Sequence, residues 1–227
     1  MVDEGDMTGG PIREAGATYG GTIPGHDGQP AFALVRRQLA PIPVLLAVPH
    51  AGRSYPASLL AGMRDPSEAC LRLEDRLVDL VARAVARQTG AVLLAANAPR
   101  ALIDLNRSPD DMDWEMVAGV APRGSSRYAA GRRARSGLGL VPRRLAGMGE
   151  IWFRQISRED LDGRIEQVHR PYHAALGASL ESLRDRWGSA LLIDLHSMPP
   201  LGPKTGADPA ADFVVGDRYG ASCSGRL

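Results

Sequence analysis

Residues 43–50 read Pro-Val-Leu-Leu-Ala-Val-Pro-His, a short apolar run that two prolines enclose and a histidine follows. A run of this length, rich in branched side chains, is typical of a strand buried on both faces of a sheet. Residues 91–96, Ala-Val-Leu-Leu-Ala-Ala, and residues 190–195, Ala-Leu-Leu-Ile-Asp-Leu, repeat the pattern. We therefore expect three buried strands, of which the first leads into His50 and the last into His196.

Two helical patterns lie between these runs. In residues 74–88 the apolar side chains recur at helical spacing, and we expect them to face the core: Leu77, Leu80, Val81, Ala84 and Val85. The second pattern starts at a capping box at Ser157, should kink at Pro171 and ends at Gly188, as the first ends at Gly90. This order of strands and helices predicts an α/β sandwich with a mostly parallel sheet.

The other segments carry weaker signals. Residues 100–107, Arg-Ala-Leu-Ile-Asp-Leu-Asn-Arg, alternate apolar and polar side chains, as a half-exposed strand would. Residues 108–150 lack periodicity and are expected to form a long excursion over the core. Residues 1–30 hold repeated glycine and few large apolar groups, so we expect a flexible tail before a single domain over residues 31–227.

The composition excludes several classes of protein. The 227 residues are 44% hydrophobic with a net charge of +1, which favours neither nucleic acid nor acidic lipid as a partner. No apolar run approaches the ~20 residues of a membrane span, and the acidic N-terminus is unlike a signal peptide. Cys70 and Cys223 lack any paired spacing, so we expect reduced thiols and a cytoplasmic location.

Two histidines suggest a metal centre. His50 and His196 each follow a predicted strand, and ligands of such sheets collect beyond the carboxyl ends of the strands. A catalytic zinc usually takes three protein ligands and leaves one position open, so a carboxylate should complete the set. Asp75 and Glu74 are the first candidates, and three further carboxylates stand behind them: Asp79, Asp104 and Asp194. The alternative is that both histidines are loop residues bonded to backbone.

Arg100, Asn106 and Arg107 form a second candidate group. Arginine forks bind carboxylates through two hydrogen bonds, and an adjacent asparagine can fix the orientation of the ligand. The alternative is a surface network of salt bridges with nearby carboxylates: Asp110, Asp111 and Asp113. Because 26 of the 27 basic residues are arginine, the abundance of arginine by itself indicates nothing about function.

His169 and His173 have the i, i+4 spacing of a helical metal pair, but Pro171 between them opposes that geometry. A supporting or substrate-side role for His173 or Tyr172 is favoured over a metal pair, and core packing is favoured over both.

Five segments in order resemble the motifs of the N-formylglutamate amidohydrolase family. They are Val-Pro-His-Ala-Gly at 48–52, Asp75 with Asp79, the stretch 100–107, Arg-Pro-Tyr-His at 170–173 and Ile-Asp-Leu-His-Ser-Met at 193–198. The resemblance runs from about Pro43 to the end of the chain and implies a three-layer α/β/α sandwich with a mostly parallel mixed sheet, similar to the carboxypeptidase-like zinc exopeptidases.

The resemblance also implies an activity: Zn²⁺-dependent hydrolysis of a small N-acyl amino acid, most often N-formyl-L-glutamate to formate and glutamate, a late step of histidine breakdown. It implies metal ligation by His50 and His196, with Asp75 as our choice of third ligand, because Arg53 stands where related exopeptidases have a glutamate. It implies that Arg100 polarises the scissile carbonyl and that Asn106 and Arg107 bind a carboxylate, with His173 on the substrate side.

The family generally continues beyond residues 216–220 to a late strand that carries a glutamate resembling the general base. We therefore expect this chain to lack its C-terminal portion, which would expose a sheet edge and favour a homo-oligomer. Two alternatives remain: a hydrolase of another N-formyl or N-acyl amino acid, and a catalytically impaired homologue that binds such a ligand.

Overall fold

The computed structural model describes residues 16–119, 131–199, 201, 211–217 and 219–223. The chain divides into two compact units, Met1–Ser197 and Met198–Leu227, where we expected a single domain from residue 31 onward. In the second unit the described residues form no helix or strand, and Phe213, Val214 and Val215 are exposed. The candidate site residues all belong to the first unit.

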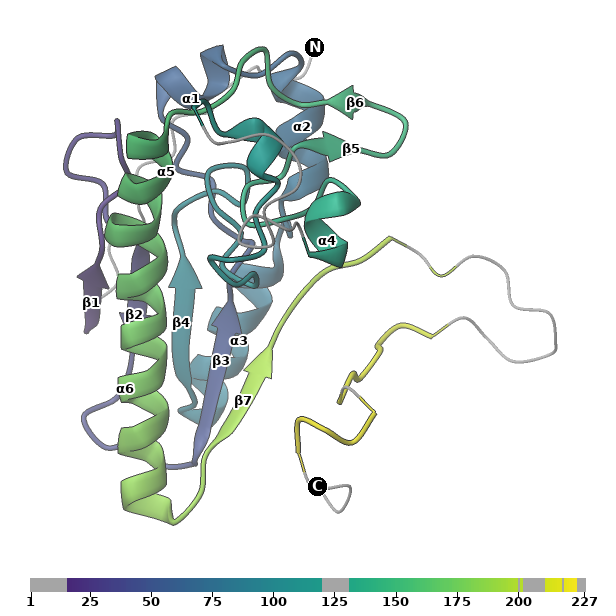
Figure 1. Cartoon of the computed structure of the whole chain (residues 1–227). Coiled ribbons are helices and arrows are strands. Elements are labelled where there is room, and N and C mark those ends of the chain that lie inside the picture. The colour runs from purple at the N-terminus through teal and green to yellow at the C-terminus, as the bar shows by residue number, and fades with distance from the viewer. Residues whose placement is uncertain (1–15, 120–130, 200, 202–210, 218, 224–227) are drawn as a thin grey trace, which may run out of the picture. The chain divides into compact units, whose positions relative to one another are not determined.

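A mixed five-stranded sheet forms the centre of the first unit (Figure 1). In chain order its strands are β1 (Ala17–Gly20), β2 (Phe32–Val35), β3 (Val44–Val48), β4 (Val92–Ala96) and β7 (Leu191–Asp194). They lie in the order β1-β2-β4-β3-β7, with β3 parallel to both β4 and β7 and β2 antiparallel to both β1 and β4. The α/β class and the buried strands at β3 and β4 are confirmed.

Both edges of the sheet differ from expectation. Strand β1 and the buried Ile23 belong to the fold, so the expected tail over residues 1–30 is wrong for residues 17–23, while residues 1–15 lie outside the described part. Strand β7 is an edge strand with Leu192 and Ile193 exposed, not the buried strand we expected. An apolar run does not reveal whether a neighbour covers it, because that neighbour is distant in sequence.

Helix α3 (Val78–Thr89) packs on β3 and β4 with the opposite face to the one expected. Its small residues Ala82 and Ala86 are buried against Leu46 and Leu93, whereas the larger side chains are exposed: Leu77, Leu80, Val81 and Val85. The helix starts four residues later than the pattern suggested, after Leu77 in a left-handed conformation with φ 69°. Gly90 ends it as expected.

Helices α5 (Arg158–Arg164) and α6 (Arg170–Trp187) form one continuous rod beside the sheet (Figure 1). Ser157 is the N-cap, with its side chain accepting from the Asp160 amide, and Gly188 ends the rod, as expected. A π-helix, η3 (Ile165–His169), joins the two helices directly before Pro171, whose missing N–H was expected to disturb the helix. Tyr172 and Leu183 pack into the core with Leu45 and Leu94, on the face of the sheet away from α3.

The remaining described elements are short. They are α1 (Ala57–Ala61), α2 (Pro66–Leu73), η1 (Trp114–Met116), α4 (Arg132–Arg135), β5 (Arg144–Leu145) and β6 (Gly149–Glu150). Residues 100–107 form turns and not the strand we expected. Leu102, Ile103, Asp104 and Leu105 are all buried, so the alternation of apolar and polar residues marks no solvent face there. None of the described helices has the apolar length that a bilayer crossing needs.

Gly52, four residues after the end of β3 and two after His50, lies where two backbone segments approach closely at the carboxyl edge of the sheet. A Cβ at Gly52 would overlap the Ala98 carbonyl, whereas a Cβ at Gly177, inside α6, meets no atom within 4 Å. Gly52→Ala should lower the free energy of unfolding by about 1–3 kcal/mol, and Gly177→Ala should raise it by about 0.5–1 kcal/mol. Urea denaturation measures both, and equal effects would contradict this packing.

Candidate metal centre

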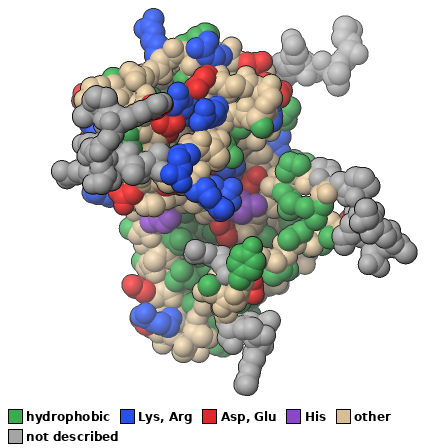
Figure 2. Space-filling model, turned by 45° about the vertical axis from the view of Figure 1, so that its right-hand side comes forward, with side chains coloured by type: hydrophobic (Ala, Val, Ile, Leu, Met, Phe, Trp, Pro, Cys, Tyr) green, Lys and Arg blue, Asp and Glu red, His purple; other side chains and the backbone are tan. Residues whose placement is uncertain are grey.

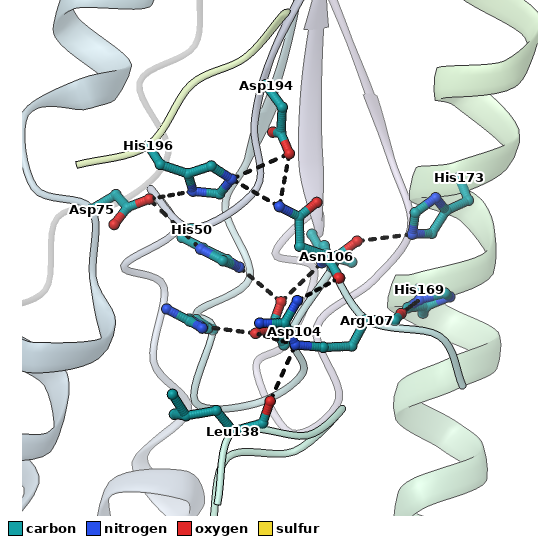
Figure 3. A network of polar contacts seen from close by, with 12 residues as sticks. His50, Asp75, Asp104, Asn106, Arg107, Leu138, His169, His173, Asp194 and His196 are labelled. Carbon is teal, nitrogen blue, oxygen red and sulfur yellow. Dashed lines mark hydrogen bonds and ion pairs between the residues drawn. The ribbon is translucent and has the colours of Figure 1, made fainter. Parts of the chain in front are cut away.

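Three side chains converge at the carboxyl edge of the sheet (Figure 3). His50 follows β3, His196 follows β7, and Asp75 lies in the loop between α2 and α3. One ligand atom from each lies within 4.8 Å of the others. The Asp75 Oδ2 atom is 2.7 Å from His196 Nδ1 and 3.6 Å from His50 Nδ1. These three side chains therefore lie together, as we predicted from the sequence.

The local fold explains this convergence. Strands β3 and β7 are parallel neighbours with Ala47 opposite Asp194, so the residues that follow them emerge side by side. The Asp75 amide donates to the His50 carbonyl at 2.9 Å, which fastens the α2–α3 loop to the end of β3. The His50 and His196 rings then lie 4.8 Å apart between centroids.

The outer nitrogen of each histidine lies beside a second carboxylate. His50 Nε2 is 2.8 Å from Asp104 Oδ1, and His196 Nε2 is 3.2 Å from Asp194 Oδ2. An ionised carboxylate only accepts hydrogen bonds, so His50 Nε2 donates to Asp104 and His50 Nδ1 faces Asp75, whereas both ring nitrogens of His196 lie beside carboxylates, Nδ1 beside Asp75 and Nε2 beside Asp194. Carboxylates in this position fix the ring and make a histidine a better metal ligand.

Protons occupy the cluster where a cation would bind. Burial opposes the charged form of His196, but hydrogen bonds and charges of Asp194 and Asp75 prevail and raise its pKa to about 9. Burial likewise disfavours the charged form of Asp75, yet hydrogen bonds from His196 and His50 hold its pKa well below the usual range. A divalent cation at this point would compensate the same carboxylate, and two imidazoles with a carboxylate suit zinc.

Glu74, the other candidate for the third ligand, is engaged elsewhere. The Tyr55 hydroxyl donates to Glu74 Oε1 at 2.8 Å, and Arg76 Nε donates to Oε2 at 2.9 Å. Arg53 is similarly engaged, because its guanidinium donates to Asp79 at 3.1 Å. The structure therefore brings Asp75, and neither Glu74 nor Asp79, into the cluster.

Asp104 links the histidines to the arginine group. Its side chain is fully buried. It accepts hydrogen bonds from Arg100 Nε at 2.9 Å and from the backbone amide of Asn106 at 2.9 Å, and Arg107 Nε lies 3.9 Å away. Burial disfavours the charge of Asp104, but the hydrogen bond from His50 and the charges of His50, Arg100 and Arg107 lower its pKa to about 2. The alternative, a surface network with Asp110, Asp111 and Asp113, is not found for Arg100 and Arg107 among the described residues, because both lie beside Asp104.

Asn106 and Arg107 lie on the open side of Asp104. Asn106 Nδ2 donates to Asp194 Oδ2 at 2.7 Å, beside the His196 ring. Arg107 donates to the Leu138 carbonyl at 3.1 Å and to the Asn106 carbonyl at 2.9 Å. Both side chains are thus held in place next to the three-residue cluster.

His169 and His173 support this loop from behind (Figure 3). His169 Nε2 lies 2.9 Å from the Arg107 carbonyl and His173 Nε2 lies 3.0 Å from the Leu105 carbonyl, so the pair brackets Asn106. Their rings are 4.3 Å apart, and each is bound to backbone, which argues against a metal pair. Contact of His173 with a substrate stays a prediction.

The cluster opens to solvent on one side. The side chain of His196 is 33% exposed, whereas those of His50 and Asp104 are 5% and 0% exposed. Figure 2 shows histidine side chains at the surface next to a basic area. A small polar ligand can therefore reach the cluster past His196.

From the sequence we considered Asp104 and Asp194 only as further candidates for metal ligands. We did not predict that each carboxylate orients a histidine. The spacing Asp194-Leu-His196 was the available signal, since alternate residues of a strand end share one side. No comparable local signal joins Asp104 to His50, because 54 residues separate them.

Comparisons with known proteins agree on one family. The family model described as N-formylglutamate amidohydrolase matches residues 42–227. The chain is 32% identical to the N-formylglutamate deformylase of Pseudomonas putida over 80% of this chain and 61% of that protein. It is 27% identical to the protein of the same name in Pseudomonas aeruginosa, over 82% of this chain and 63% of that one. The chain thus spans somewhat over three-fifths of these curated relatives.

Solved structures show the same likeness. The crystal structure of an N-formylglutamate amidohydrolase from Ralstonia eutropha JMP134 has a TM-score of 0.71 and 35% identity, over 84% of this chain and 67% of that one. A gene product of Agrobacterium tumefaciens shares the fold alone, with a TM-score of 0.54 and 17% identity over 76% of this chain and 58% of that one.

The buried Asp104 yields a prediction about stability. Asp104→Asn removes the charge that compensates Arg100 and His50, and should lower the free energy of unfolding by about 3 kcal/mol. Asp185→Asn is the matched control, because Asp185 pairs with Arg184 at the exposed surface and its loss should leave the urea midpoint unchanged. Similar shifts of the urea midpoint for both variants would show that the buried charge of Asp104 does not stabilise the fold.

A second prediction concerns pH. Burial, as the main cause, lowers the pKa of His169 and of His173. Imidazoles in the unfolded chain titrate near pH ~6.5. Below that pH the unfolded chain binds protons that the buried rings of the folded chain do not bind, so the free energy of unfolding falls as the solution becomes more acidic. The double variant His169→Gln/His173→Gln should lose less stability than the wild type between about pH 6.5 and pH 5, measured by urea denaturation. Parallel curves would contradict this.

Proposed function

The chain belongs to the N-formylglutamate amidohydrolase family, and from that premise we propose that it hydrolyses N-formyl-L-glutamate to formate and L-glutamate at a Zn²⁺ site. The observation that carries the proposal is the convergence of His50, Asp75 and His196, with Asp104 and Asp194 behind the two histidines. His50 Nδ1, Asp75 Oδ2 and His196 Nδ1 would hold the ion. When bound, zinc supplies a Lewis acid and activates water for attack on the amide.

The residues around the cluster fit the substrate. N-formylglutamate is a small dianion, and Arg107 with Asn106 would bind one of its carboxylates, since both already lie at the open side of Asp104. Arg100 is anchored to Asp104 through Nε alone, which leaves the end of its guanidinium for the formyl oxygen. A cation there would stabilise the charge that develops on this oxygen in the transition state.

The proposal extends to architecture and location. Helix α3 on one face of the sheet and helix α6 on the other support a three-layer α/β/α sandwich like that of the carboxypeptidase-like zinc exopeptidases. Both cysteines, Cys70 and Cys223, are free, which supports a reducing, cytoplasmic setting. A place in histidine catabolism rests on membership of the family. The exposed edge strand β7 supports association with a further copy of the chain.

One observation favours a second candidate, a homologue that binds an N-acyl glutamate without hydrolysing it. Among the described residues, the carboxylates that flank the ligands are all engaged: Glu74 by Tyr55 and Arg76, Asp104 by His50 and Arg100, and Asp194 by Asn106. A general base contributes about 10²–10⁴ in rate. Without a free one, this chain would bind the ligand and turn it over slowly.

The first test measures zinc content and formate release together. The wild type should carry one zinc per chain, His50→Ala and His196→Ala should lose it, and His26→Ala, outside the cluster, should keep it. A wild type without zinc, or variants that keep it, would refute the metal site.

Formate release then separates the two candidates. Formate produced from N-formyl-L-glutamate supports the hydrolase, and calorimetric binding without formate supports the binding homologue. A higher kcat/KM for N-acetyl-L-glutamate than for the formyl compound would instead indicate another N-acyl amino acid as the substrate.

A further inference from the structure

Two segments that carry proposed zinc ligands lie side by side at the carboxyl edge of the sheet. Residues 50–55 follow β3 and begin with His50, and residues 74–79 pass from the end of α2 into α3 and include Asp75. The hydrogen bond from the Asp75 amide to the His50 carbonyl joins the two backbones at 2.9 Å. A single bond still allows the segments to turn about it, so the direction of the Asp75 side chain depends on further contacts.

Two side-chain contacts join the same segments, one before and one after Asp75 in the sequence. The Tyr55 hydroxyl donates to Glu74 Oε1 at 2.8 Å, and the Arg53 guanidinium donates to Asp79 at 3.1 Å. The Arg53 side chain is 42% exposed, so solvent weakens its ion pair. The Glu74 side chain is only 3% exposed, and a hydrogen bond to a buried, ionised carboxylate is among the strong ones. Tyr55 therefore makes the firmer of the two contacts.

Glu74 is held at both carboxylate oxygens and at its backbone. Arg76 Nε donates to Glu74 Oε2 at 2.9 Å, opposite the bond from Tyr55, and the Glu74 amide donates to the Cys70 carbonyl at 3.1 Å. An apolar side chain would fill the same space without the desolvation cost of a buried charge. Packing alone therefore does not account for a carboxylate at this position, directly before Asp75.

The backbone after Asp75 is constrained as well. Leu77 has a left-handed conformation with φ 69°, which brings a steric cost to any residue with a Cβ atom. Its side chain is largely exposed, so burial of the leucine does not offset that cost. Backbone strain of this kind persists where surrounding contacts over-determine the conformation, and it is found at active sites and ligand clamps. The loop of residues 74–77 is thus held from both ends.

We propose that Tyr55 is a positioning residue, which acts through Glu74 to direct the Asp75 carboxylate toward the two histidines. Asp75 Oδ2 already lies 2.7 Å from His196 Nδ1 and 3.6 Å from His50 Nδ1. A ligand held in place before the ion arrives binds it more tightly, and partners behind the ligands change metal affinity by about 10–100-fold. The inference rests on the proposed zinc site and adds a residue that does not itself ligate the metal.

The zinc affinity of Tyr55→Phe tests the proposal, because this change removes the hydroxyl and keeps the ring. Competition with a chromophoric chelator should give a dissociation constant about tenfold higher than that of the wild type. Tyr219→Phe makes the same chemical change at a fully exposed position and should leave the constant unchanged. When Asp75→Ala is already present, Tyr55→Phe should have no further effect, because the hydroxyl acts only through Asp75.

Hydrogen exchange in the metal-free protein gives a readout that does not depend on zinc. The Asp75 amide should exchange several-fold faster in Tyr55→Phe, because its bond to the His50 carbonyl would open more often. The amide of Leu94, in the buried strand β4, should keep its rate. A loss of global stability would instead raise the exchange rate at both positions.

Three results would overturn the proposal. They are an unchanged zinc dissociation constant in Tyr55→Phe, an equal loss of affinity when Asp75→Ala is already present, and an equal rise of exchange at Asp75 and Leu94. A wild type that binds no zinc would refute the metal site instead. The exchange rates would then still decide whether Tyr55 holds the loop that carries Asp75.

Discussion

The hydrogen bond between the buried carboxylate of Asp104 and Nε2 of His50 organises the candidate site. Because Asp104 is fully buried, its charge must be compensated inside the protein. His50 does so from the end of β3, and Arg100 and the Asn106 backbone amide do so from the stretch 100–107 that holds Asp104 itself. The same contact fixes the protonated nitrogen of His50, which turns Nδ1 toward Asp75. Ring orientation and arginine position thus depend on one carboxylate.

The sheet sets the other half of this geometry. Parallel pairing of β3 with β7 brings His50 and His196 to one edge, and the bond from the Asp75 amide to the His50 carbonyl adds the third side chain. The loop of Leu105, Asn106 and Arg107 is then fixed from the far side by the histidines of the π-helix and α6. A π-helix at a functional site is a recurrent arrangement, and here it places two rings against one loop.

The sequence predicted the parts of this fold that depend on local pattern. The strands at β3 and β4, the caps at Ser157, Gly90 and Gly188, and the meeting of His50, Asp75 and His196 agree with expectation. The failures share a cause, which is tertiary contact. Leu80 and Val81 were expected inside, but close approach of α3 to the sheet favours Ala82 and Ala86. Turns at residues 100–107 satisfy a buried Asp104 that no alternation pattern reveals.

The central claim is that His50, Asp75 and His196 together hold zinc. An anomalous difference map from a crystal grown with zinc, recorded on both sides of the zinc absorption edge, tests it most directly. The account predicts one peak enclosed by His50 Nδ1, Asp75 and His196 Nδ1, with Asp104 and Asp194 still bonded to the outer nitrogens. A peak between His169 and His173, or coordination by Glu74 in place of Asp75, would contradict it.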